Sequence, residues 1–264
     1  MPAYKDELRT KKRKRLVSRL AFFVVVLVAG TTGATYLLFF ARLVDVRDMT
    51  IETSEELRAG IDSTANDWLD GGFWQFTKRN NLFFLSGDAL VSSLLGQFPE
   101  LESAAVTKKF PHSLIISTRE RRPEGIWCLT GADRCFYFDK NGKAFGETQP
   151  SDGFLVLNVI DQRPRELKLG DIVAEEGWTT NILKARELLA KSDVNVSAFI
   201  IPVDSFDEFH AKTAQGWKIL FSNQTDIESQ ISSLTSFLKE KLTPAQIPQP
   251  QYIDLRIQDR IYYK

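Results

Sequence analysis

The chain has 264 residues, 34 of them basic and 34 acidic, so its formal net charge is zero. Eight basic and two acidic residues lie within the first 19 positions, which leaves the remainder weakly acidic. A weakly acidic body argues against nucleic-acid binding, because such binding depends on basic surfaces that neutralise phosphates. The length is sufficient for one large or two small domains with buried cores.

Residues 20–41, LAFFVVVLVAGTTGATYLLFFA, carry no charged side chain and follow a basic tail at 1–19. As a helix this stretch would extend roughly 33 Å, which is enough to cross the hydrocarbon core of a bilayer. The basic tail then favours a cytoplasmic N terminus, with the rest of the chain on the far side of the membrane. The alternatives are a buried core helix and a cleaved signal peptide. Continued apolar sequence up to Phe40 favours the uncleaved anchor.

The next segment has the order strand, helix, helix, strand, strand. Its elements are expected at 44–51, 57–69, 86–98, 101–110 and 113–120. Thr53 and Glu56 have the spacing of a capping box, and Ser86 is expected to cap the second helix. Basic residues on and after the final strand pair are expected either to form a solvated face or to contact a partner or lipid headgroups. They are Lys108, Lys109, Arg119, Arg121 and Arg122.

From Glu124 onward the sequence alternates between short strands and turns. Strands are expected at 125–129, 135–139, 154–160, 198–203, 206–212 and 217–222. A helix is expected at about 179–191, and Thr225 with Glu228 predicts a capping box for another. Pro244, Pro248 and Pro250 predict an extended connector, and after them Ile253, Leu255 and Ile257 alternate with polar residues as in a half-buried strand.

Cys128 and Cys135 would lie at facing ends of the first hairpin of this region. Outside the cytoplasm a disulfide between them could persist. Free thiols and a metal site with His112 and His210 are the alternatives, although no metal-binding spacing of cysteines or histidines is present.

Two groups of motifs resemble a known family. Phe98-Pro99-Glu100-Leu101, Phe110-Pro111 and the run from Arg119 to Pro123 are similar to the POTRA domain, a module that docks polypeptides beside a membrane. The segment from Tyr252 to Lys264, together with Phe136-Tyr137-Phe138-Asp139, resembles the β domain of the bacterial division protein family FtsQ, also called DivIB.

This resemblance implies an α+β chain with four parts. They are a cytoplasmic tail at 1–19, a transmembrane helix at 20–41, a POTRA-like domain at 42–123 and a β domain at 124–264. It further implies a septal, non-enzymatic scaffold in the cytoplasmic membrane. Its partners would be FtsB/DivIC-like and FtsL-like single-span division proteins, and it would help to regulate septal peptidoglycan synthesis.

A strand left at a sheet edge can accept a partner strand, and the C-terminal strand is the candidate. The expected partner-binding residues are Tyr252, Asp254, Arg256, Gln258, Arg260 and Tyr262. Arg256 and Arg260 could equally form local ion pairs with Asp254 and Asp259.

The sequence contains no HExxH, G-x-S-x-G or phosphate-binding glycine-rich motif. We therefore expect no catalytic residues, no cofactor, no metal, no nucleic acid and no small-molecule substrate. Apart from the division proteins, the expected contact is membrane lipid. Two other functions stay open. A POTRA-bearing transport or envelope-assembly component would need a long run of barrel strands after the POTRA unit. An anchored cell-wall enzyme would need peptidoglycan chemistry.

Overall fold

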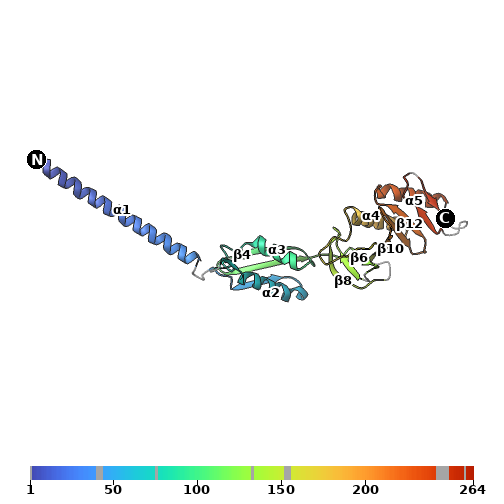
Figure 1. Ribbon diagram of the computed structural model, residues 1–264, viewed down its shortest axis with the longest axis horizontal. Helices are drawn as coiled ribbons and strands as arrows, with labels where there is room; N and C mark the ends of the chain where they lie inside the picture. The colour runs from blue at the N-terminus through green and yellow to red at the C-terminus, as the bar shows by residue number, and fades with distance from the viewer. Residues whose placement is uncertain are drawn as a thin grey trace. The chain divides into compact units, whose positions relative to one another are not determined.

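The computed structural model describes residues 2–39, 44–74, 77–131, 134–151, 156–241, 250–258 and 260–264 (Figure 1). The chain divides into two compact units, residues 1–97 with 103–119, and residues 98–102 with 120–264. Several expectations fall outside the described residues. They are the end of the span at Phe40 and Ala41, the start of the strand at Phe154, the connector at Pro244 and Pro248, and Asp259.

The first helix, α1, spans Pro2–Phe39 and contains an apolar stretch, Leu16–Tyr36, long enough to cross a membrane. The basic tail and the apolar stretch therefore form one continuous helix. A membrane anchor and a signal sequence share these properties.

The first unit has the expected strand-helix-helix-strand-strand order, with a small hairpin inserted between its helices. Its elements are β1 (Asp48–Glu52), α2 (Glu55–Asp70), β2 (Gly72–Trp74), β3 (Thr77–Lys78), α3 (Gly87–Gln97), β4 (Leu101–Lys109) and β5 (Ser113–Glu120). The three long strands form a sheet in the order β1-β5-β4, with β1 parallel to β5. Apolar residues of α2 and α3, among them Ile61 and Leu94, are fully buried.

Both predicted capping boxes are wrong by one residue. Helix α2 begins after Ser54, and the hydroxyl of Thr53 is buried without a hydrogen-bond partner. Helix α5 (Ile227–Lys241) is capped by Asp226, whose carboxylate accepts from the Ser229 N–H at 2.8 Å, while the Thr225 hydroxyl is buried without a hydrogen-bond partner among the described residues. The cap on α3 is as expected, because Ser86 Oγ accepts from the Ala89 N–H at 3.2 Å.

The second unit is built on a mixed nine-stranded sheet with the order β14-β13-β12-β11-β10-β9-β6-β7-β8. Its strands are β6 (Gly125–Leu129), β7 (Arg134–Phe138), β8 (Ala144–Thr148), β9 (Leu157–Asp161), β10 (Val196–Ile201), β11 (Glu208–Thr213), β12 (Lys218–Ser222), β13 (Tyr252–Asp254) and β14 (Tyr262–Tyr263). The predicted α+β fold class, with an apolar N-terminal helix and two sheet-containing parts, is confirmed.

Helices α4 (Trp178–Lys191) and α5 lie together on one face of this sheet (Figure 1). The core beneath them is aromatic, with Phe199, Phe209 and Phe221 fully buried. Directly paired residues share a face of a sheet, so each row of pairs across the strands faces one side. One row crosses all nine strands: Thr148, Cys135, Cys128, Ile160, Ile200, His210, Leu220, Asp254 and Tyr262.

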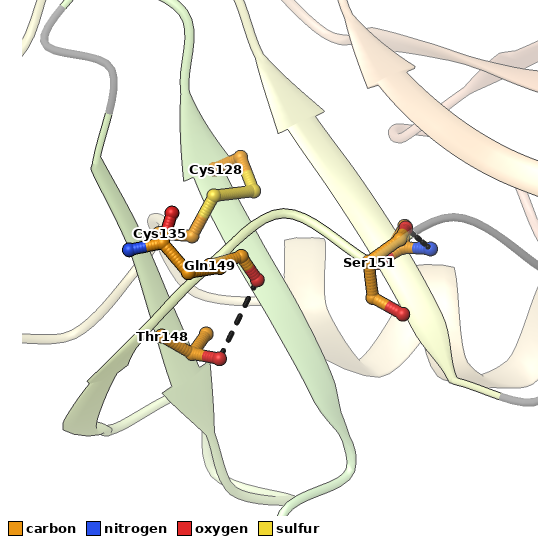
Figure 2. The surroundings of a disulfide bond; sticks show 6 residues. Cys128, Cys135, Thr148, Gln149 and Ser151 are labelled. Carbon is orange, nitrogen blue, oxygen red and sulfur yellow. Dashed lines mark hydrogen bonds between the residues drawn. A yellow bond between two sulfur atoms is a disulfide. The ribbon is translucent and has the colours of Figure 1, made fainter.

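Cys128 and Cys135 are joined by a disulfide between directly opposed positions of β6 and β7, with their Cα atoms 4.0 Å apart. Figure 2 shows the bridge beside Thr148 of the edge strand β8. Both sulfur atoms are therefore engaged, and neither is available as a metal ligand. The disulfide and the C-terminal strands belong to the same row of paired residues.

Arg121 is not part of a solvated face. Its guanidinium pairs with Asp139, and the two side chains are only 10% and 6% exposed. Arg121 Nε also donates to the Pro99 carbonyl at 2.8 Å. Asp139 in turn accepts from the N–H groups of Asn141 and Lys143, both at 2.9 Å. The ion pair thus ties the segment after β5 to the turn between β7 and β8.

Candidate functional site

The C-terminal segment forms two short strands instead of one. Strand β13 adds in parallel to β12, and the chain then turns back so that β14 pairs antiparallel with β13. The predicted alternation holds for Ile253 and Leu255, which are buried, and fails at Ile257, which is 52% exposed. The reason is the turn: the Arg260 N–H donates to the Ile257 carbonyl, so the extended conformation has already ended.

Strand β14 is the edge of the nine-stranded sheet. The Lys264 N–H donates to the Tyr252 carbonyl at 3.2 Å, so the backbone of Lys264 faces β13. Backbone groups of successive residues in a strand point to opposite sides, so the N–H and C=O of Tyr263 point away from the sheet. Among the described residues no strand pairs with the outer side of β14, and a strand edge of this kind is a template for another strand.

Exposed tyrosines flank this edge. Tyr262 and Tyr263 are 46% and 54% exposed. Tyr263 pairs with the buried Ile253, and its ring lies 5.0 Å from that of Phe237 on α5, centroid to centroid. Tyr262 pairs with Asp254 and therefore faces the side of the sheet opposite α5.

A charged cluster occupies the opposite face next to Tyr262. Arg256 donates to both carboxylate oxygens of Asp254, at 2.9 and 2.7 Å, and also pairs with Glu208 on β11. Burial acts to raise the pKa of Asp254, but hydrogen bonds from the Arg256 side chain and backbone outweigh it and hold that pKa below its ordinary value. The same hydrogen bond to Asp254 raises the pKa of Arg256. Arg256 is therefore a fixed cation that joins β11 to the end of β13.

His210 extends the cluster toward the centre of the sheet. Its Nε2 lies 3.4 Å from Glu208 Oε1, without hydrogen-bond geometry. Burial lowers the pKa of His210, the cations Lys218 and Arg256 lower it further, and Glu208 opposes the shift. His210 is thus held in its neutral form under conditions in which an exposed histidine begins to bind a proton.

Replacing His210 by glutamine is expected to flatten the dependence of stability on pH. The folded pKa lies below that of the unfolded chain, so the unfolded state binds more protons between the two values. The stability that neutral His210 contributes is therefore complete above the unfolded pKa and is lost as pH falls through the folded pKa. Urea unfolding of the full chain in detergent, followed between about pH 5 and pH 7.5, measures this dependence.

The matched control is His112→Gln, which changes the histidine of the first unit. The unfolding free energy of the second unit should fall toward acid pH in the parent and in the His112→Gln variant, and should fall less in the His210→Gln variant. Equal slopes in all three proteins would contradict this account.

Of the remaining predicted residues, Tyr252 is half-buried on β13 and pairs with Lys218 of β12, and the other two lie in a separate place. Gln258 and Arg260 line a depression of about 290 Å³ that is shared with the beginning of α5, including Asp226. Another depression, of about 270 Å³, lies beside Arg256 and is bordered by Phe206, which is 90% exposed. The structure therefore groups Asp254, Arg256 and Tyr262 around the face opposite α5, and places Gln258 and Arg260 at the start of that helix.

Sequence reasoning missed three members of this region, Phe206, Glu208 and His210. Tyr263 belonged to the predicted edge strand but was not among the expected contact residues. Glu208 is 48 positions from its partner Arg256, so no local pattern links them. Tyr263 could have been recognised from its aromatic neighbour Tyr262 if the C-terminal segment had been predicted to form two strands separated by a turn. Among the described residues no group of three or more His, Cys, Asp and Glu side chains could hold a metal ion.

Comparison with known proteins gives a similarity that bears on function. The chain is similar to the cell division protein FtsQ of Anaeromyxobacter sp. (strain K), with 32% identity over 127 residues, or 44% of this chain. The match covers 42% of the length of that protein, so the chain spans less than half of the curated relative. No protein-family model matches the chain. The resemblance to FtsQ indicated by the sequence is confirmed at this level of similarity.

Proposed function

We propose that this chain is a non-enzymatic, membrane-anchored scaffold of the bacterial division complex. It binds FtsB/DivIC-like and FtsL-like single-span proteins and helps to regulate septal peptidoglycan synthesis. The similarity to a cell division protein supports a role in cell division. The observation that carries the binding role is the open edge of β14, flanked by exposed tyrosines.

The partner adds a strand to β14. Its backbone pairs with the outward N–H and C=O of Tyr263, and the main chain supplies affinity. On one face of the sheet, Tyr262 and the charged cluster around Arg256 contact every second side chain of the partner strand. These contacts supply specificity. Because Arg256 is held by Asp254 and Glu208, little side-chain entropy is lost when a partner contacts it.

The proposed topology places the N terminus in the cytoplasm, α1 across the cytoplasmic membrane and both units outside. The eight basic residues of the tail support this orientation. The Cys128–Cys135 disulfide fits the same placement, since disulfides persist in compartments that are not kept reducing. Within this arrangement we assign residues 42–123 to a POTRA-like domain and residues 124–264 to the partner-binding β domain.

A fluorescent fusion to the N terminus of the full chain, imaged in dividing cells, tests the proposal. We expect enrichment at midcell before and during constriction. Uniform labelling of the envelope throughout the cell cycle would contradict a division role and would favour the envelope-assembly alternative. A fusion to an unrelated single-span protein provides the uniform reference.

A further inference from the structure

One end of the first unit exposes a cluster of phenylalanines. Phe83, Phe84 and Phe110 are 51%, 48% and 55% exposed, and the rings of Phe83 and Phe110 lie 5.0 Å apart. Phenylalanine is normally among the more buried residues, and apolar side chains gathered on a surface mark a contact site.

These aromatics lie beside the segment that leads from α1 into β1. The Leu82 N–H donates to the Val44 carbonyl at 2.9 Å, which places the turn bearing Phe83 and Phe84 beside the entering segment. On its other side the Arg47 N–H donates to the His112 carbonyl at 2.9 Å, so the turn that carries Phe110 is adjacent as well. Both aromatic turns therefore pack against the first residues of the unit.

Chain length keeps this end of the unit close to the end of α1. Phe39 is the last residue of the helix, and Val44 is five residues further along. Five residues extend at most about 18 Å. The headgroup region of a bilayer adds several ångströms beyond its hydrocarbon core on each side. If α1 spans the membrane, the phenylalanines are within reach of the lipid headgroups.

The charge beside the aromatic cluster suits anionic lipid. Lys108 and Lys109 immediately precede Phe110; Lys109 is exposed and Lys108 half-buried. Neither makes an ion pair with any residue in the part of the chain that the structure describes. The carboxylate of the nearby Asp48 lies 3.6 Å from Nε2 of His112. Lysine next to exposed phenylalanine is the combination found in segments that lie in the membrane interface.

We propose that the patch formed by Phe83, Phe84, Phe110, Lys108 and Lys109 docks on the surface of an anionic phospholipid bilayer. Docking adds a second attachment to the one through α1 and restricts the orientations of the first unit. The proposal rests on the membrane anchor of the proposed function and does not depend on the partner edge at β14.

Photocrosslinking of the full chain in nanodiscs of phosphatidylcholine with phosphatidylglycerol tests the docking. Benzoylphenylalanine is placed singly at Phe83 or Phe110, and at Ser103 as an exposed control near the other end of β4. We expect lipid adducts at Phe83 and Phe110 and few at Ser103. In the variant with Lys108→Ser and Lys109→Ser, adduct yield should fall roughly fivefold or more.

A benzoylphenylalanine probe at Val26 within α1 distinguishes a failure of lipid docking from a failure of the membrane anchor. Lipid adducts at Val26 together with yields at Phe83 and Phe110 no higher than at Ser103 would overturn docking and leave the anchor intact. Absence of lipid adducts at Val26 would overturn the anchor itself. Irradiation of the same variants in cells must also give mainly lipid adducts; mainly protein adducts would show that a partner or a second copy covers the patch, and would overturn lipid docking.

Discussion

Replacing Tyr263 by proline is expected to weaken capture of the FtsB-like and FtsL-like partners by about ten- to a hundredfold. Proline removes the outward N–H of β14, and the partner carbonyl that would accept from it is then buried without a donor. The hydrogen bond from Lys264 to Tyr252 on the inner side is retained. An edge position is also where a strand tolerates proline.

Tyr263→Ala is the matched control, since it removes the ring that contacts Phe237 and keeps the backbone N–H. Both variants are compared by titrating the partners against full-length protein in detergent. Under strand addition the alanine variant should retain most of the affinity that the proline variant loses. Undiminished capture by the proline variant would contradict strand addition at this edge.

Deleting the whole predicted strand, residues 252–264, is a weaker experiment. Ile253 and Leu255 are 0% and 3% exposed and belong to the core of the second unit. Their removal destabilises the sheet together with its edge. Loss of capture after that deletion would not distinguish a missing docking strand from an unfolded unit.

Replacing Arg121 by methionine is expected to destabilise the second unit by about 3 kcal/mol or more. The substitution leaves the Asp139 carboxylate, which is 6% exposed, without its cation. It also removes the hydrogen bond from Arg121 Nε to the Pro99 carbonyl. Breaking a buried ion pair on one side is costly because the remaining charge is poorly solvated.

Lys140→Ala is the matched control for the same region. Lys140 pairs with Glu102 at 3.5 Å, and the two side chains are 65% and 34% exposed, so the loss should stay below about 1 kcal/mol. Urea unfolding of the full chain, followed by tryptophan fluorescence, gives both values. Equal destabilisation by the two substitutions would show that the Arg121–Asp139 pair contributes no more to stability than the exposed Lys140–Glu102 pair.

The features predicted correctly are those set by local periodicity. Alternation of apolar residues and short turn sequences were sufficient for the hairpins β4–β5 and β6–β7, and one apolar stripe was sufficient for α3. The capping boxes at Thr53 and Thr225 failed because their spacing alone does not fix the first helical residue.

Contacts between segments that are distant in the sequence could not be predicted from local sequence patterns. Arg121 appeared in a basic run typical of a solvated strand face, yet Asp139 in the next hairpin draws it into a buried pair. Arg256 was correctly linked to Asp254 as one alternative, whereas Glu208 and His210 required the strand order β11-β12-β13 to be known. The division of the C-terminal segment into β13 and β14 depends on a turn that has no strong sequence signal.

The most direct test of a division role is depletion of this protein in the organism that encodes it, with cell length and septal peptidoglycan incorporation measured over successive generations. We expect depleted cells to elongate without completing septa, and the full chain, but not the Tyr263→Pro variant, to restore division. Depleted cells that continue to divide at normal length, with unchanged septal incorporation, would contradict the proposed function.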